Sequence, residues 1–104
     1  MDAQMKKGIL DACVLAELRG RDGYGYSILK SLSGVVNISE STLYPILRRL
    51  EQSHCLTTYT MECDGRLRKY YRITEAGRRK LNDFLVEWQE LAAVYNYIRD
   101  KTRY

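Results

Sequence analysis

The sequence predicts a mainly helical α+β fold, in which three helices are followed by a two-stranded β-hairpin and a long final helix. Three observations predict it. Apolar residues recur at helical spacing in three segments before residue 53 and in one after residue 74. Between these segments, two runs of β-branched and aromatic residues flank an Asp-Gly pair, which is typical of a tight hairpin turn. The chain has 104 residues, enough for about one domain.

Glycines set the boundaries of the first two predicted helices. The first is expected from Lys6 to Arg19, with Gly20 as its end, and its apolar residues cover nearly every side. Such a helix must be covered by neighbours from more than one direction. After a turn at residues 21–23, a second helix is expected over residues 25–33, ended by Gly34.

The third helix is expected to follow Ile38, with Ser39 or Ser41 as its N-cap. An interior proline disrupts a helix, so Pro45 indicates either a start at Thr42 or a kink. One side of this helix carries a buried stripe of Leu43, Ile46, Leu47 and Leu50. The opposite side and its edges are hydroxyl-rich and basic, and they carry Ser41, Thr42, Tyr44, Pro45, Arg48, Arg49 and Gln52.

The hairpin is expected to have two strands, residues 56–62 and 68–73, joined by a turn at residues 63–66. Residues 66–80 hold seven Lys and Arg side chains against one acid, Glu75. A charge run is by default a solvated surface, but this one includes the tip and the return strand of the hairpin. Because successive side chains of a strand point to opposite faces, at least one of Tyr70 and Tyr71 should lie in the core.

The final helix is expected to begin after Thr74 and to run nearly to the C-terminus, with an apolar stripe along one side. About thirty residues at about 1.5 Å each span ~45 Å, whereas a compact 100-residue domain is ~26 Å across. The far half should therefore project, and a second chain is the simplest cover for its apolar stripe. We predict a two-fold homodimer. The alternative is that this helix folds back over its own core.

Composition and motifs exclude several classes of protein. No apolar run approaches the ~20 residues that cross a bilayer, and the N-terminal segment lacks the pattern of a secretion signal, so we expect a cytoplasmic protein. The three cysteines form no CxxC pair, which predicts free thiols rather than disulfides. The weak candidate for a metal site is His54 with Cys55 and Cys63, and we expect no metal and no cofactor. Catalytic motifs are absent from the sequence, so an enzyme is not expected.

Three helices and a basic hairpin form the layout of a winged helix-turn-helix, and the residue chemistry suits duplex DNA. A helix in the major groove needs an apolar side for its own core and a polar, basic side for base edges and phosphates. Residues 41–49 meet this need. Arg66, Arg68 and Lys69 would reach phosphates or the neighbouring minor groove. The alternative is a winged helix that binds protein or RNA and no operator.

Three motifs in order carry a family resemblance: residues 23–28 (GYGYSI), 41–51 (STLYPILRRLE) and 68–77 (RKYYRITEAG). They closely resemble the signature of the PadR-like family of bacterial transcriptional regulators, over residues 5 to about 90. The length is similar to that of the short subfamily, in which one C-terminal helix dimerises. The resemblance implies a DNA-binding domain at residues 1–75, a dimerisation helix at residues 76–104, and a dimeric repressor of a palindromic operator that a small molecule or stress signal releases.

The resemblance also implies the site. It places Tyr44 and its neighbours against DNA, accounts for Pro45, and makes residues 65–69 the wing. The residues expected at DNA are Lys6, Lys7, Tyr24, Ser41, Thr42, Tyr44, Pro45, Arg48, Arg49, Gly65, Arg66, Arg68 and Lys69. Trp88 is expected either to pack in the dimer or, as in some similar short members, to stack on a planar aromatic effector. The residues expected at this dimer interface or effector pocket are Leu10, Val14, Phe84, Trp88, Leu91, Tyr95 and Ile98.

The chain departs from the family pattern after the third helix, where His54 stands in the position of a usual glycine. That position is expected to take the left-handed C-cap conformation, which costs His more than Gly. We therefore interpret His54 as a helix cap rather than as a ligand.

Overall fold

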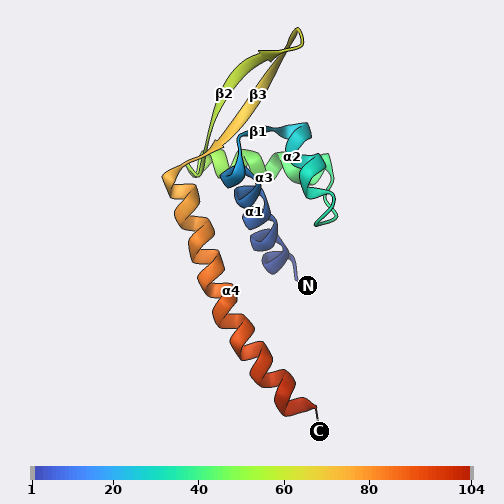
Figure 1. The fold of residues 1–104 in the computed structure, drawn as a ribbon, viewed down its shortest axis with the longest axis vertical. Helices are drawn as coiled ribbons and strands as arrows, with labels where there is room; N and C mark the ends of the chain where they lie inside the picture. Colours follow the sequence, from blue (N-terminus) through green and yellow to red (C-terminus); the bar gives the residue numbers. More distant parts are fainter. Residues whose placement is uncertain (1, 104) are drawn as a thin grey trace.

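The computed structural model describes residues 2–103 and contains the predicted helices and hairpin in the predicted order (Figure 1). Met1 and Tyr104, the outer ends of the two predicted segments 1–75 and 76–104, lie outside the described residues. The elements are α1 (Ala3–Gly20), β1 (Gly23–Tyr24), α2 (Gly25–Leu32), α3 (Glu40–Gln52), β2 (Leu56–Cys63), β3 (Arg66–Ile73) and α4 (Glu75–Thr102). This mainly helical winged helix-turn-helix with a long C-terminal helix confirms the predicted fold class.

The core lies where α1, α2 and α3 meet the base of the hairpin. Val14 of α1 and the pair Leu43 and Leu47 of α3 are completely buried, and Ile46 and Leu50 are also buried, which confirms the predicted stripe on α3. Tyr71 is buried as well, as the alternation of the strand predicted. The burial of α1 on several sides follows from its apolar residues, which leave no polar face wide enough to lie against water.

The first helix begins at Ala3, so the predicted start at Lys6 was wrong. The reason is Asp2, whose carboxylate Oδ1 accepts a hydrogen bond from the Met5 backbone N–H at 2.8 Å. This N-cap satisfies one of the free N–H groups of the first turn and so extends the helix by three residues.

The third helix runs through its proline. Ser39 is the N-cap and Glu40 the first helical residue, so the predicted alternative of a start at Thr42 was wrong, and Pro45 lies in the second turn. At the other end, His54 has φ 64°, and its N–H donates to the carbonyl of Glu51 at 3.0 Å. The Cys55 N–H donates to Leu50 O at 2.9 Å. These two bonds form a Schellman motif, which confirms the predicted left-handed cap.

The sheet has three strands in the order β1-β3-β2, all antiparallel, so the predicted two-stranded ribbon lacked one strand. The missing strand is Gly23–Tyr24, which pairs with Tyr71 and Tyr70 and is too short to show any periodicity in sequence. The two long strands reach further toward the turn than predicted. Asp64 (φ 53°) and Gly65 (φ 77°) are both left-handed, as a two-residue type I′ hairpin turn requires.

The final helix has 28 residues and projects from the rest of the chain, as predicted (Figure 1). Its N-cap is Thr74, whose Oγ1 accepts from the Gly77 N–H at 3.1 Å, and Leu81 is buried against the core. Every residue from 89 to 103 is exposed. The Cα radius of gyration is 16.2 Å, whereas a compact domain of this length has about 13 Å. The alternative, a helix folded back over its own core, was wrong.

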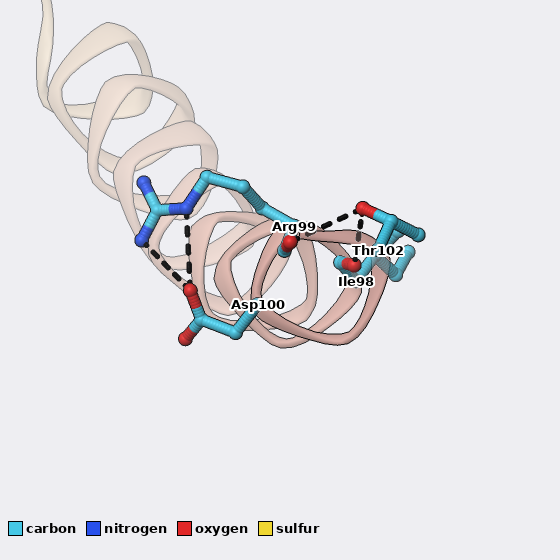
Figure 2. A network of polar contacts seen from close by, with 4 residues as sticks. All are labelled: Ile98, Arg99, Asp100 and Thr102. Atoms are coloured by element: carbon cyan, nitrogen blue, oxygen red, sulfur yellow. Dashed lines mark hydrogen bonds and ion pairs between the residues drawn. The ribbon is translucent and has the colours of Figure 1, made fainter. Parts of the chain in front are cut away.

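The exposed end of α4 is a regular helix up to its last turn (Figure 2). The Thr102 hydroxyl reaches back to the carbonyl oxygens of Ile98 and Arg99, at 3.0 and 3.1 Å, and Arg99 pairs with Asp100 at 3.4 Å. Basic side chains in this turn also favour the negative end of the helix dipole. Local bonds therefore hold a helix end that makes no contact with the core. Within residues 2–103, no helix is both long and apolar enough to cross a membrane.

Candidate nucleic-acid interface

The helix α3 divides cleanly into a buried and an exposed side. Its apolar stripe lies in the core, while Ser41, Thr42, Pro45 and Arg48 are exposed and the Tyr44 side chain is 42% exposed. Among the ion pairs of residues 2–103, none involves Arg48. The exposed side therefore offers hydroxyl groups, one phenol and one guanidinium to a partner.

The start of α3 is rich in hydroxyl groups. Ser39 Oγ lies 3.0 Å from Ser41 Oγ and 3.2 Å from Thr42 Oγ1. Small hydroxyl side chains at the N-terminus of a helix surround its free N–H groups, where the helix dipole favours negative charge. This end of α3 suits a phosphate or the edge of a base.

Tyr44 reaches its position because residue 25 is glycine. A Cβ atom at Gly25 would lie 2.2 Å from Tyr44 Oη, so the phenol ring lies directly against the first residue of α2. This contact fixes the ring across the junction of the two helices and leaves its outer edge exposed.

The hairpin of β2 and β3, which we call the wing, carries exposed cations near its tip. Arg66 and Lys69 are exposed, and Leu67 between them is 77% exposed. Arg68 lies over the ring of Tyr24, with its guanidinium carbon 4.4 Å from the ring centre. A cleft of about 740 Å³ separates the wing from the helices and is lined by Tyr24, Gly25, Tyr26, Tyr44, Arg66, Leu67, Arg68, Lys69 and Tyr71. The cleft thus brings together five of the residues expected at DNA, from β1, α3 and β3: Tyr24, Tyr44, Arg66, Arg68 and Lys69.

Two of the cations expected at DNA have partners within the chain. Arg49 donates through Nη2 to Asp11 of α1, which is 6% exposed, and Lys69 Nζ lies 3.4 Å from Glu51 Oε1. Arg49 therefore holds α1 against α3 rather than pointing outward. Asp11 was missed as its partner. The signal was present in the sequence, because a buried acid inside a helix that is apolar on all sides needs a cation as its partner.

Lys6 and Lys7 lie away from the wing. Both are exposed on the N-terminal half of α1, and the N-terminal end of α1 points to the side of the molecule opposite the wing (Figure 1). Lys7 also lines a cleft of about 410 Å³, together with the Asp11–Arg49 pair, Lys80 and Phe84. Lys7 therefore lies beside Arg49 and the C-terminal end of α3 rather than beside the wing.

The residues expected at a dimer interface or effector pocket fall into three groups. Leu10 and Val14 are part of the core of their own chain. Phe84 and Trp88 are half-buried, with ring centres 5.7 Å apart, and they line a cleft of about 370 Å³ between α1 and α4 together with Leu91. The third group is exposed on the projecting part of α4 and comprises Leu91, Tyr95 and Ile98.

The cysteines are free, and Cys55 is buried. Burial raises the pKa of the Cys13 thiol, which keeps it protonated at neutral pH. In the described part of the chain, His, Cys, Asp and Glu side chains form no cluster that could hold a metal ion.

Comparison with known proteins identifies the family. The defining pattern of the transcriptional regulator PadR-like family matches residues 14–83. The crystal structure of smu.1704 from Streptococcus mutans has a TM-score of 0.82 and 37% identity, over 90% of this chain and 89% of that one. Transcriptional regulator Rv3488 of Mycobacterium tuberculosis is 44% identical over 55 residues, 53% of this chain and 51% of that protein.

A further similar structure, Bacillus subtilis PadR, was solved in complex with operator DNA. It has a TM-score of 0.68 and 26% identity, over 75% of this chain and 46% of that one. The fold, the three motifs and the family pattern over residues 14–83 agree. The chain therefore belongs to the PadR-like family of transcriptional regulators.

Proposed function

We propose that two copies of this chain, joined through α4, bind a two-fold-symmetric DNA operator and repress transcription. The exposed side of α3 enters the major groove, and the wing contacts the flanking backbone or the adjacent minor groove. In this proposal, residues 1–75 form the DNA-binding domain and residues 76–104 the dimerisation helix.

One observation supports the proposal most: α3 is buried on its apolar side and exposed on its hydroxyl-rich, basic side. An α-helix that reads DNA needs both properties, because its core side fixes its orientation and its outer side reaches base edges. Ser41, Thr42 and Arg48 are exposed residues of the types that bond to bases and phosphates. Family membership and the operator complex of Bacillus subtilis PadR support the same role.

The projecting half of α4 supports the dimer. Leu91, Tyr95 and Ile98 follow one another along one side of the helix and are 45%, 60% and 54% exposed. A stripe of this kind in water is unfavourable by roughly 25 cal/mol for each Å² of apolar surface, so burial against a second copy stabilises the helix. A two-fold pair of chains presents two α3 helices, which suits half-sites one helical turn of DNA apart, about 34–36 Å.

The test measures DNA affinity by fluorescence anisotropy, using a duplex selected from random-sequence DNA on the wild-type protein. Arg48→Ala should weaken binding by ~1 to 3 kcal/mol and relax the preference at one base pair in each half-site. The matched control is Arg103→Ala, which removes the same charge at the exposed C-terminal end of α4 and should leave binding nearly unchanged. Unchanged affinity in Arg48→Ala would contradict the proposed interface and favour a winged helix that binds protein or RNA.

The effector in this proposal is a small planar aromatic molecule that binds at Trp88 and releases the operator. The cleft between α1 and α4 supports it, because the half-buried rings of Phe84 and Trp88 form one wall and Leu91 extends it. Apolar rings recognise flat ligands by stacking. The test titrates a panel of planar dyes and follows Trp88 emission and DNA release together. Quenching and release at the same concentration support the proposal, and the absence of quenching across the panel leaves Trp88 a packing residue.

A further inference from the structure

The strand pairing that joins the wing to the rest of the described chain lies at the base of the wing. The short strand β1 pairs with Tyr70 and Tyr71 and with no residue nearer the tip, so residues 60–69 form a ribbon of two strands. From the Tyr59–Tyr70 pair to the turn at Asp64 is about five residues, or about 17 Å at about 3.3 Å per residue. A tilt of about 10° at the base therefore moves the tip by about 3 Å, which is enough to break a hydrogen bond to a phosphate.

One face of the ribbon is held by Asp22, which lies between α1 and β1. Its Oδ2 accepts from the Tyr59 hydroxyl at 2.8 Å and from Arg72 Nε at 3.0 Å, and Arg72 Nη2 lies 2.9 Å away. The hydrogen bond from Arg72 holds the pKa of Asp22 below its usual value, so this carboxylate is charged at neutral pH. Asp22 thus joins a residue of β2 and a residue of β3 to the end of α1.

The opposite face of the ribbon is held by Glu51, in the last turn of α3. Its Oε2 accepts from Thr58 Oγ1 at 3.2 Å, and its Oε1 lies 3.4 Å from Lys69 Nζ. Thr58 and Tyr59 are neighbours on β2, and neighbouring side chains of a strand point to opposite faces. The two carboxylates therefore contact the base of the wing from its two sides.

A row of aromatic rings extends across the sheet from Tyr59, the hydrogen-bond partner of Asp22, to Tyr24 of β1. Tyr59 and Tyr70 stack with ring centres 5.4 Å apart and 10° between their planes, and Tyr24 meets Tyr70 edge-on at 5.4 Å. Arg72 lies over Tyr59 at 5.1 Å, and Arg68 lies over Tyr24. Packed rings therefore connect Asp22 to the guanidinium of Arg68.

We propose that Asp22 and Glu51 are positioning residues: together they form a clamp at the base of the wing that sets the angle between the wing and α3. Neither residue needs to touch DNA. The clamp fixes where Arg66 and Arg68 meet the phosphates relative to the α3 side chains in the major groove. This inference rests on the proposed DNA-binding function.

Removing a carboxylate should change the DNA affinity in opposite directions under the two explanations. If only the net charge matters, the affinity rises; if the clamp matters, the affinity falls. Removing an acid raises the net charge from +4 to about +5, and a more positive protein binds DNA more tightly if only the overall field matters. A clamp predicts weaker binding, because the wing contacts are formed in a smaller fraction of molecules. The matched control is Glu75→Ala, which makes the same charge change in the first turn of α4.

The experiment measures anisotropy titrations of the selected duplex at several salt concentrations with Asp22→Ala, Glu51→Ala and Glu75→Ala. The clamp predicts about fivefold to tenfold weaker binding and a shallower salt dependence for the first two, with equal or tighter binding for the control. Tyr59→Phe removes only the hydroxyl donor to Asp22 and should lose affinity in the same direction by a smaller factor. Affinity equal to or above that of the wild type in both carboxylate variants would overturn the proposal.

A second readout does not involve DNA. Amide hydrogen exchange of residues 66–70 should be several-fold faster in Asp22→Ala and Glu51→Ala than in the wild-type protein, while exchange in α1 and α3 stays the same. Unchanged exchange in the wing would overturn the clamp. If the wild-type protein selects no duplex, the proposed function fails, and hydrogen exchange alone then decides whether the clamp exists.

Discussion

His54 is a residue whose replacement should stabilise the protein. Its backbone has φ 64°, a conformation that glycine adopts without steric cost, and its side chain is exposed. The bonds at this position all use the backbone: the His54 N–H donates to Glu51, and its carbonyl accepts from Thr74 Oγ1 at 2.6 Å. A glycine at residue 54 would keep each of these bonds.

The expected gain is the difference of two terms. A left-handed backbone costs a non-glycine residue roughly 1–2 kcal/mol. Glycine loses more conformational entropy on folding, which costs about 0.5–1 kcal/mol. His54→Gly should therefore raise the free energy of unfolding by about 0.75 kcal/mol at the midpoint of these ranges, and by at most about 1.5 kcal/mol. At about 4–8 °C per kcal/mol, the midpoint corresponds to a rise of about 3–6 °C in the melting temperature.

The assay is thermal unfolding followed by far-UV circular dichroism, at equal protein concentrations because a dimer melts in a concentration-dependent way. The control is His54→Ala, which deletes the ring but keeps Cβ, and should melt at or below the wild-type temperature. A glycine variant that melts no higher than the alanine variant would refute the reasoning about the cap.

Three further predictions concern the core, the interface and pH. Leu47→Ala should lower the free energy of unfolding by about 2–5 kcal/mol, measured in urea, because its fully buried side chain leaves a cavity in the stripe of α3. Gly25→Ala should displace the Tyr44 ring and weaken DNA binding in anisotropy titrations while the dimer persists in sedimentation; wild-type affinity would contradict the role of this contact. The ion pair of Asp22 with Arg72 should stabilise the fold at pH values above about 4, where an unfolded carboxyl is charged, and this stability should be lost as the pH falls through the lower pKa of the folded state. Unfolding curves of wild type and Asp22→Ala should therefore differ at neutral pH and converge in acid, and a constant difference would contradict the assignment.

Much of the fold follows from the sequence because its signals are local. The stripe on α3 shows its period within one helix, and the Asp64-Gly65 turn needs only the preference of two residues for left-handed backbone. The predicted length of α4 exceeds the diameter of a compact domain of this size, and this alone implied that the helix projects from the core. The absence of catalytic motifs also predicted correctly that the chain is not an enzyme, since the family is one of transcriptional regulators.

Apart from the starts of α1 and α3, which depend on local caps, what the sequence did not reveal concerns contacts between distant residues. The two-residue strand β1 has no periodicity, and it is a strand only because Tyr70 lies beside it, 46 positions along the chain. The pairing of Arg49 with Asp11 and that of Arg72 with Asp22 span 38 and 50 residues. Periodicity places a cation on a face of its own element, but it does not show which carboxylate the fold brings to it.

Hydroxyl-radical footprinting of the complex with the selected duplex tests the central claim most directly. Two chains that each insert α3 predict two protected segments related by two-fold symmetry, with centres about 10 base pairs apart or a multiple of one helical turn. Protection of the backbone on either side of each segment should weaken in the double variant Arg66→Ala and Lys69→Ala, which removes exposed cations of the wing. A single protected segment, or symmetric protection that survives Arg48→Ala with unchanged affinity, would contradict the account.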